Sequence, residues 1–225
     1  AEHATDPTNA SRTMLYHLTD AVWDPSLLDL LGVPRALLPE VRSSAGDFGN
    51  ALVEHLGIEV PIAGVAGDQQ AALFGQGCWH AGLAKNTYGT GAFLLLTTGA
   101  EAVPSMRVLL TTAACDAKGD VAYALEGSVF IAGAAIQWLR DGLGLLGDAS
   151  ESEAMAAALE SNEGVYFVPS FVGLGAPHWM PDARVALFGL TRGTTREHLV
   201  RASLSAMAYG TPEVLVAFAA DSSTQ

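Results

Sequence analysis

The stretch Gly67-Asp68-Gln69-Gln70-Ala71-Ala72-Leu73-Phe74-Gly75-Gln76, with Lys85-Asn86-Thr87-Tyr88-Gly89-Thr90-Gly91 shortly after it, decides the fold predicted for this chain. The apolar run 60–66 before it has the composition of a buried strand. Asp68 then stands where a helix N-cap is expected, ahead of a helix over residues 69–74. The second part ends in a glycine-rich turn whose backbone can approach phosphate oxygens closely. The order of strand, acidic residue, helix and small-residue turn indicates a site where a carboxylate and backbone amides lie near each other.

Composition limits the classes of partner. The chain has 225 residues and is 50% hydrophobic, which is enough for one large or two small domains. The 24 acidic and 11 basic residues give a net charge of −13, which argues against a nucleic acid or an anionic membrane as partner, since both need basic patches. No apolar run approaches the length of a membrane-spanning helix and no secretory leader is recognisable, so we expect no membrane insertion.

The cysteines and histidines carry little sign of metal or disulfide chemistry. Cys78 and Cys115 have no CxxC spacing, which favours a reduced, cytoplasmic setting. The six histidines form no HxxxH pair and no His/Cys cluster, so we expect no structural zinc site.

The pattern of apolar residues and turn formers predicts a mixed chain. Two short helices are expected near the start, one at 27–31 ended by Gly32 and one between Pro34 and Pro39. A β-hairpin is expected over 83–98, turning at 88–91. Further strands are predicted at 107–112, 121–125 and 165–169, and further helices at 130–139, 150–159 and 195–219. Strands and helices in this mixture predict an α/β or α+β fold.

Several blocks of the sequence together show a resemblance to a known family. They are, in chain order, 5–15, 64–76, 85–93, 125–130 with its continuation to 141, 173–179 and 188–195. These blocks resemble the FGGY carbohydrate kinases, and within them the glycerol kinases, and they cover nearly the whole chain. The resemblance implies an α/β fold of the actin-like (ribonuclease H-like) ATPase type, present here in incomplete form.

The resemblance also implies a division of the chain. Residues 1–75 would be the tail of the family's N-terminal domain, and residues 76–225 most of its C-terminal domain. Family members are about twice this length, so the chain looks like the middle of such a kinase. The family's N-terminal phosphate loop, its early polyol-binding residues and its late adenosine-binding segment have no counterpart here. We therefore expect no kinase activity from this chain alone.

The activity implied by the resemblance is ATP-dependent phosphorylation of glycerol to glycerol 3-phosphate, with Mg2+ bridging the phosphates. The partners would be glycerol or a related polyol and ATP or ADP, and the family is compatible with a homo-oligomer. Two alternatives stay open. The chain could belong to another FGGY kinase, acting on a different polyol or a ketose, or it could be a non-catalytic fragment that serves only as an interaction module.

Three residues are carried over as polyol-site candidates. Asp68 would be the general base that takes the proton of the attacking hydroxyl, although its place before a helix also fits a plain N-cap. Gln69 would hydrogen-bond a substrate hydroxyl, or it is simply a polar residue on an exposed first turn. Phe93 would pack against the carbon backbone of the polyol, although an aromatic residue in a strand is more often core.

Three further residues are carried over as nucleotide-site candidates. Thr90 lies in the Gly89-Thr90-Gly91 turn, which by itself is a weak signal because such turns are common. Gly133 and Gln137 share a helix face at i, i+4 spacing, and their alternative role is helix packing by a small residue beside an exposed amide. In the family these three positions contact the nucleotide.

The chain departs from the family pattern near its end and in one loop. Val185 replaces a usual glycine and Ser205 a usual acidic or amide residue, while Gly210 and Pro212 fall inside a normally uninterrupted helix, where they are expected to interrupt it. Glu59 is acidic where regulation by a sugar bisphosphate would need basic residues, so we expect that control to be absent.

Overall fold

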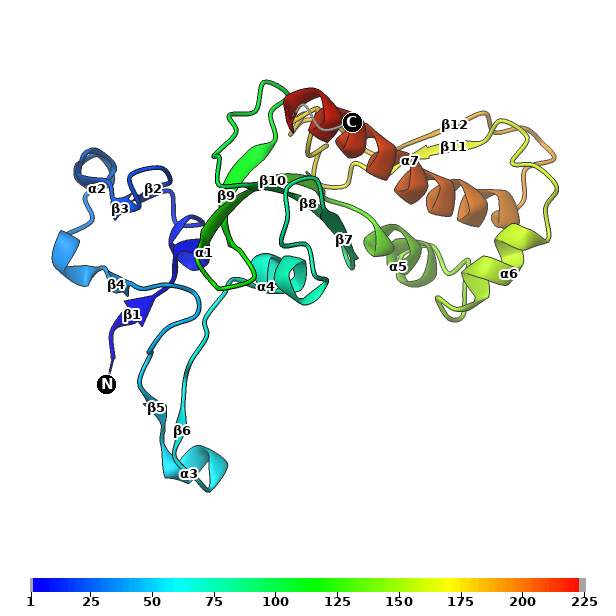
Figure 1. Ribbon diagram of the computed structural model, residues 1–225. Coiled ribbons are helices and arrows are strands. Elements are labelled where there is room, and N and C mark those ends of the chain that lie inside the picture. The colour runs from blue at the N-terminus through cyan, green and yellow to red at the C-terminus, as the bar shows by residue number, and fades with distance from the viewer. Residues whose placement is uncertain (1, 223–225) are drawn as a thin grey trace.

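A four-stranded antiparallel sheet forms the centre of the computed structural model, which describes residues 2–222 (Figure 1). The strand order is β7-β8-β10-β9. The strands are β7 (Ala84–Tyr88), β8 (Ala92–Gly99), β9 (Leu110–Cys115) and β10 (Val121–Val129). Tyr88 pairs with Ala92 across the turn at 89–91, which confirms the hairpin predicted over 83–98.

Strand β9 begins later than the sequence predicts. The apolar run 107–112 indicated a strand, but β9 starts at Leu110. Residues 105–109 form a turn instead, because the Ser105 hydroxyl oxygen accepts from the amides of Arg107 and Leu109 at 3.1 and 2.8 Å. Val108 takes a positive φ of 59° in this turn. A local side-chain bond therefore competes with the ladder at the start of the strand.

The sheet is covered on both faces, by α4 (Asp68–Gly75) on one side and α7 (Arg196–Ser222) on the other (Figure 1). Leu95 packs in a cluster with Leu73 of α4, whereas Leu94 and Leu96 pack in a cluster with Val214 of α7. Alternation of side chains along β8 explains this division. A strand buried on both faces also explains the unbroken apolar run 93–96 that made the hairpin recognisable.

Helix α7 is continuous through Gly210 and Pro212, so the expected interruption is wrong. Proline in a helix removes one backbone hydrogen bond and costs about 3 kcal/mol. Packing compensates here, because Val214, Ala217 and Phe218 are buried in the cluster against the sheet. Gly210 suits its position, since a Cβ there would lie 3.3 Å from Val129.

The part of the chain after the sheet packs against the first half of α7. It contains α5 (Gly133–Asp141), α6 (Glu151–Ala157), β11 (Tyr166–Val168) and β12 (Ala186–Phe188), and β11 pairs antiparallel with β12. The helices predicted at 130–139 and 150–159 and the strand end at 165–169 are confirmed in type, with small shifts at their ends. Val185, one of the departures from the family pattern, packs here beside Phe167 and Ala202.

The N-terminal part consists of short elements around its own small core of Ala10, Leu15, Tyr16, Trp23 and Leu28. These elements are β1 (Ala4–Thr5), α1 (Pro7–Ala10), β2 (Tyr16–His17), β3 (Val22–Trp23), α2 (Pro25–Leu31), η1 (Arg35–Leu37) and β4 (Glu40–Val41). Gly32 ends α2 in the left-handed conformation, as its position predicted. The helix expected between Pro34 and Pro39 is a single 3-10 turn.

An extended arm leaves this N-terminal part and returns to α4 (Figure 1). It is built from β5 (Asn50–Ala51), α3 (Val53–Leu56) and β6 (Val60–Pro61). The prediction of a buried strand at 60–66 is wrong. Only two of these residues form a strand, they pair on one side alone, and Ile62 remains exposed. A buried strand needs neighbours on both faces, and the arm provides none.

Of the helices in residues 2–222, none combines the length and the apolar character needed to cross a membrane.

Candidate functional site

The start of α4 presents Asp68 to solvent. Gly67 is the N-cap and Asp68 is the first helical residue, so the expectation that Asp68 caps the helix is wrong. Within residues 2–222 its carboxylate accepts a hydrogen bond from Gln69 Nε2 at 3.2 Å and none from a backbone amide. The side chain is exposed. The carboxylate therefore keeps acceptor capacity for another group.

A buried polar chain holds the segment just before α4. The backbone amide of Gly67 donates to Thr8 Oγ1 at 2.8 Å, and the Thr8 hydroxyl donates to Asp6 Oδ2 at 2.7 Å. Asp6 is fully buried and also accepts from the Ser44 hydroxyl at 2.6 Å and from Asn9. The segment that leads into α4 is thus held by the N-terminal part of the chain, and Asp68 takes its position from that support.

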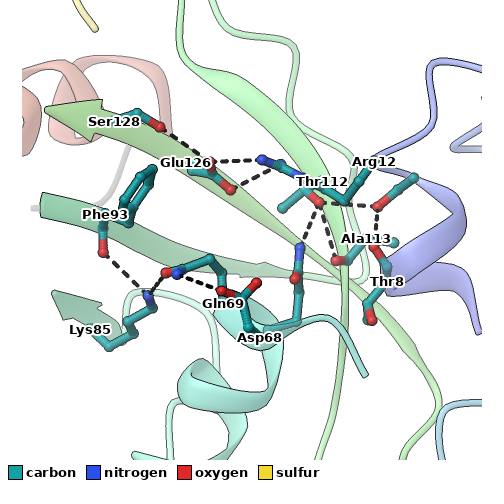
Figure 2. A network of polar contacts seen from close by, with 12 residues as sticks. Thr8, Arg12, Asp68, Gln69, Lys85, Phe93, Thr112, Ala113, Glu126 and Ser128 are labelled. Atoms are coloured by element: carbon teal, nitrogen blue, oxygen red, sulfur yellow. Dashed lines mark hydrogen bonds and ion pairs between the residues drawn. The ribbon is translucent and has the colours of Figure 1, made fainter. Parts of the chain in front are cut away.

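Lys85 joins α4 to the hairpin (Figure 2). Its ammonium donates to Gln69 Oε1, to Thr87 Oγ1 at 2.8 Å and to the Phe93 carbonyl oxygen at 3.2 Å. The side chain comes from β7 and is 7% exposed. One buried cation therefore connects Gln69 with Phe93, two of the three polyol-site candidates, and Gln69 in turn contacts Asp68.

The buried carboxylate of Glu126 lies on strand β10, which β8 separates from β7 (Figure 2). Its Oε1 accepts from Arg12 Nη2 at 3.0 Å and from the Ser128 hydroxyl at 3.2 Å. Arg12 Nη1 lies 2.9 Å from Oε2 but at an angle that makes an ion pair without a hydrogen bond. Glu126 is 1% exposed, so Arg12 supplies the charge that makes its burial tolerable.

The electrostatic setting of Lys85 follows from these neighbours. Burial lowers the pKa of Lys85 below its ordinary value, and the carboxylates of Glu126 and Asp68 and the Cys78 thiol act in the opposite direction. Loss of hydration disfavours the ammonium, whereas nearby negative charge favours it. Lys85 thus lies between a buried carboxylate and the exposed Asp68.

The three nucleotide-site candidates lie where the hairpin turn meets α5. The amide of Gly133 donates to the Gly89 carbonyl at 2.9 Å, and the amides of Ala132 and Ala134 donate to the Thr90 carbonyl at 2.8 and 3.1 Å. A Cβ at position 133 would lie 2.7 Å from the Gly89 oxygen, so glycine is needed for this approach. Thr90 and Gln137 are exposed, Gln137 one turn further along α5.

The structure therefore groups the candidates into two sets linked by β8. Gln69 and Phe93 are joined through Lys85, with Asp68 beside Gln69. Backbone hydrogen bonds join the turn that contains Thr90 to the start of α5 that contains Gly133, and the turn at 89–91 leads directly into Ala92 and Phe93.

Sequence reasoning missed the polar residues that support these sets, namely Asp6, Thr8, Arg12, Lys85 and Glu126. Glu126 carries a charge within a strand of mostly apolar and small residues, and that contrast is the signal that could have identified it.

The candidate residues do not coincide with the cavity beside α7. A cavity of about 270 Å3 lies between β11, the end of β10 and α7, lined in part by Phe130, Tyr209 and Glu213, and none of the six candidates lines it. Among residues 2–222, no three His, Cys, Asp or Glu side chains gather in a way that could hold a metal ion.

Known proteins are similar to this chain in sequence and in structure. The family model for the N-terminal domain of the FGGY carbohydrate kinases matches residues 1–75, and that for the C-terminal domain matches residues 84–225. Two curated relatives named glycerol kinase, from Shewanella piezotolerans and Bacillus mycoides, are 57% and 59% identical over 99% and 98% of this chain. The chain spans about half the length of these relatives, 45% of each.

Solved structures are also similar to nearly the whole of this chain. A Plasmodium falciparum glycerol kinase with ADP is similar over 100% of this chain and 45% of its own, with 38% identity and a TM-score of 0.88. A xylulose kinase from Brucella ovis is similar over 98% of this chain and 46% of its own, with a TM-score of 0.82. Its 22% identity shows the shared fold alone.

Proposed function

This chain belongs to the FGGY family of carbohydrate kinases, and we propose that its residues serve the ATP-dependent phosphorylation of glycerol to glycerol 3-phosphate. The observation that carries the proposal is the carboxylate of Asp68, which stands exposed at the start of α4 with no backbone amide bound to it and Gln69 beside it. Identity of 57–59% to relatives named glycerol kinase supports glycerol as the acceptor.

Asp68 acts as the general base in this proposal. A terminal hydroxyl of glycerol attacks the γ-phosphorus of ATP, the new O–P bond forms as the bond to the β-phosphate oxygen breaks, and ADP leaves. The hydroxyl proton passes to the Asp68 carboxylate. An acceptor that is already saturated by helix amides could not take this proton, and Asp68 is not saturated in that way.

Gln69 and Phe93 position the acceptor. Gln69 hydrogen-bonds a hydroxyl of the polyol next to Asp68, and the Phe93 ring packs against its carbon backbone. Because Lys85 binds both the Gln69 side chain and the Phe93 backbone, the two residues are held in one arrangement before the substrate enters. Such positioning reduces the entropy that the reaction must lose.

Thr90, Gly133 and Gln137 hold the nucleotide in this proposal. The close approach of Gly133 to Gly89 leaves no room for a side chain and holds the hairpin turn against α5, with Thr90 and Gln137 exposed beside the contact. Mg2+ would supply charge neutralisation on the phosphates. The setting of the reaction would be the cytoplasm, where ATP and reduced thiols coexist.

The test is a coupled assay of ADP release by a full-length kinase that carries these residues. Glycerol with Mg-ATP is expected to give turnover, and D-xylulose at the same concentration is expected to give much less. Turnover with xylulose and none with glycerol would contradict the proposed acceptor while leaving the family assignment intact.

A further inference from the structure

The Lys85 ammonium has one acceptor for each of its N–H groups. An ammonium group has three N–H donors and no acceptor. The three acceptors around Lys85 are a side-chain amide oxygen, a hydroxyl oxygen and a backbone carbonyl, those of Gln69, Thr87 and Phe93. The set matches the number of donors, and 93% of the residue's surface is buried, since only 7% is exposed. The group is therefore fixed by its partners.

This arrangement determines which end of the Gln69 amide faces Asp68. A lysine ammonium can only donate, so the atom of Gln69 that it contacts must be the oxygen. The amide nitrogen consequently points to Asp68, where Nε2 lies 3.2 Å from Oδ2. One N–H of Gln69 bonds Asp68 and the other is available to an incoming oxygen atom.

We infer that Lys85 is a positioning residue for the polyol, which commits Gln69 to act as a hydrogen-bond donor toward a substrate hydroxyl oxygen beside Asp68. This inference rests on the proposed function. It adds a requirement on the acceptor substrate that does not follow from the six candidate residues alone. The acceptor must offer a hydroxyl oxygen that can accept from Gln69, next to the hydroxyl that gives its proton to Asp68, which describes a vicinal diol better than an isolated alcohol.

The surrounding charges are consistent with a lysine that stays protonated in this role. Asp68 faces Lys85 from α4 and Glu126 faces it from β10, and both carboxylates offset the effect of burial on the pKa of Lys85, as does Cys78. Glu126 is itself paired with Arg12, so its charge remains buried in place. A neutral lysine would free the Gln69 amide to turn over.

The first test examines Lys85 without any assay of activity. Lys85 and Lys118 are the two lysines of the chain, and Lys118 is exposed. In protein labelled with 15N-lysine, the ammonium protons of Lys85 are expected to exchange with water more slowly than those of Lys118, with Lys118→Met giving the assignment. A Lys85 ammonium that exchanges as fast as that of Lys118 overturns the inference, whatever the protein phosphorylates.

The second test separates positioning from general stability in a full-length kinase that carries these residues. Lys85→Met is expected to raise the KM for glycerol by about tenfold or more, the scale that follows when a buried polar group loses its partner, with the KM for Mg-ATP unchanged. Lys118→Met is the matched control. Equal rises in both KM values, or an unchanged KM for glycerol, would overturn the inference.

A further variant covers the case in which Lys85→Met fails to fold. Gln69→Glu keeps a partner for Lys85, and so keeps the fold, but removes the N–H donors. It is expected to raise the KM for glycerol as Lys85→Met does, and an unchanged KM would overturn the donor role of Gln69. Failure of the proposed function would instead appear in the unaltered enzyme, as a lack of glycerol phosphorylation, with the exchange of the Lys85 ammonium protons unaffected.

Discussion

Thr8 holds the backbone immediately before Asp68. The first amides of a helix have no partner within the helix, and an aspartate near its start normally accepts from one of them. Here Gly67, one residue before Asp68, already donates to Thr8 Oγ1, and Thr8 is held by the buried Asp6. The residue before the proposed base is thus held by a distant part of the chain, and among residues 2–222 the Asp68 carboxylate accepts from Gln69 and from no backbone amide.

Gly133, which we propose to lie at the nucleotide site, has no room for a side chain. Gly133→Ala would bring a Cβ to 2.7 Å from the Gly89 oxygen, which must displace either the hairpin turn or the first turn of α5. In a full-length kinase we expect the KM for Mg-ATP to rise by about tenfold or more while the KM for glycerol stays unchanged. Gly193→Ala, whose Cβ would meet nothing closer than 3.7 Å, is the control. Normal nucleotide affinity in Gly133→Ala would remove Gly133 from the site.

At the scale of elements, apolar periodicity predicted the parts that are buried on both sides and failed where packing decides the outcome. The hairpin that becomes β7 and β8, the helix around Asp68 and the helix α5 could be read from residues 67–98 and 130–139 because each has a strong local pattern. The continuity of α7 could not, since burial against the sheet outweighs the cost of Pro212. Residues 60–66 have the composition of a buried strand but lie in an exposed arm. Composition alone does not show whether other elements pack against a segment.

The candidate site could also be predicted only in part from the sequence. The family blocks led to Asp68, Gln69, Phe93, Thr90, Gly133 and Gln137, which contact ligand in the proposal. They did not lead to Thr8, Lys85 or Glu126, because the role of these residues depends on which side chains the fold brings together. The Gly67–Thr8 contact spans 59 positions of sequence, Arg12–Glu126 spans 114 and Lys85–Gln69 spans 16.

The first turn of α7 makes one contribution to stability that depends on pH. Hydrogen bonds from Thr195, Arg196 and the backbone lower the pKa of Glu197 from its ordinary value to about 2. Since the folded pKa is lower than the unfolded one, the contribution is complete above the ordinary value of 4.5 and is lost as the pH falls toward about 2.

Glu197→Gln should therefore lower the free energy of unfolding at pH 7 and make it less dependent on acid. Urea denaturation between pH 7 and pH 2 measures both effects, with the exposed Glu101→Gln as control. The same loss of stability between pH 4.5 and 2 in the variant and the unaltered chain would show that Glu197 does not contribute in this way.

At the scale of the whole molecule, a small number of polar contacts joins the N-terminal part to the central sheet. Arg12 pairs with Glu126 of β10, the Ser11 hydroxyl lies 3.1 Å from that of Thr112 in β9, and Gln70 of α4 donates to the same Thr112 hydroxyl at 2.9 Å (Figure 2). These contacts meet next to α4, so the placement of Asp68 relative to β8 depends on them.

Arg12→Met tests the strongest of these contacts. It leaves the carboxylate of Glu126 buried without its cation, and we expect the free energy of unfolding to fall by about 2 to 4 kcal/mol. Arg12→Met combined with Glu126→Gln removes the unpaired charge and is expected to recover part of the loss. Chemical denaturation of both variants gives the comparison, and a double variant less stable than Arg12→Met would contradict the account of this pair.

We propose that Asp68 accepts the proton of the attacking hydroxyl. The variant Asp68→Asn, in a full-length kinase that carries these residues, tests this role. The asparagine keeps the shape of the side chain and cannot act as a base, so kcat should fall by about 10²- to 10⁴-fold, while the affinity for ADP, measured by calorimetry, stays unchanged. Asp29→Asn in α2 makes the same change of charge at an exposed position and should leave both quantities unaltered. A kcat in Asp68→Asn close to that of the unaltered enzyme would contradict the claim.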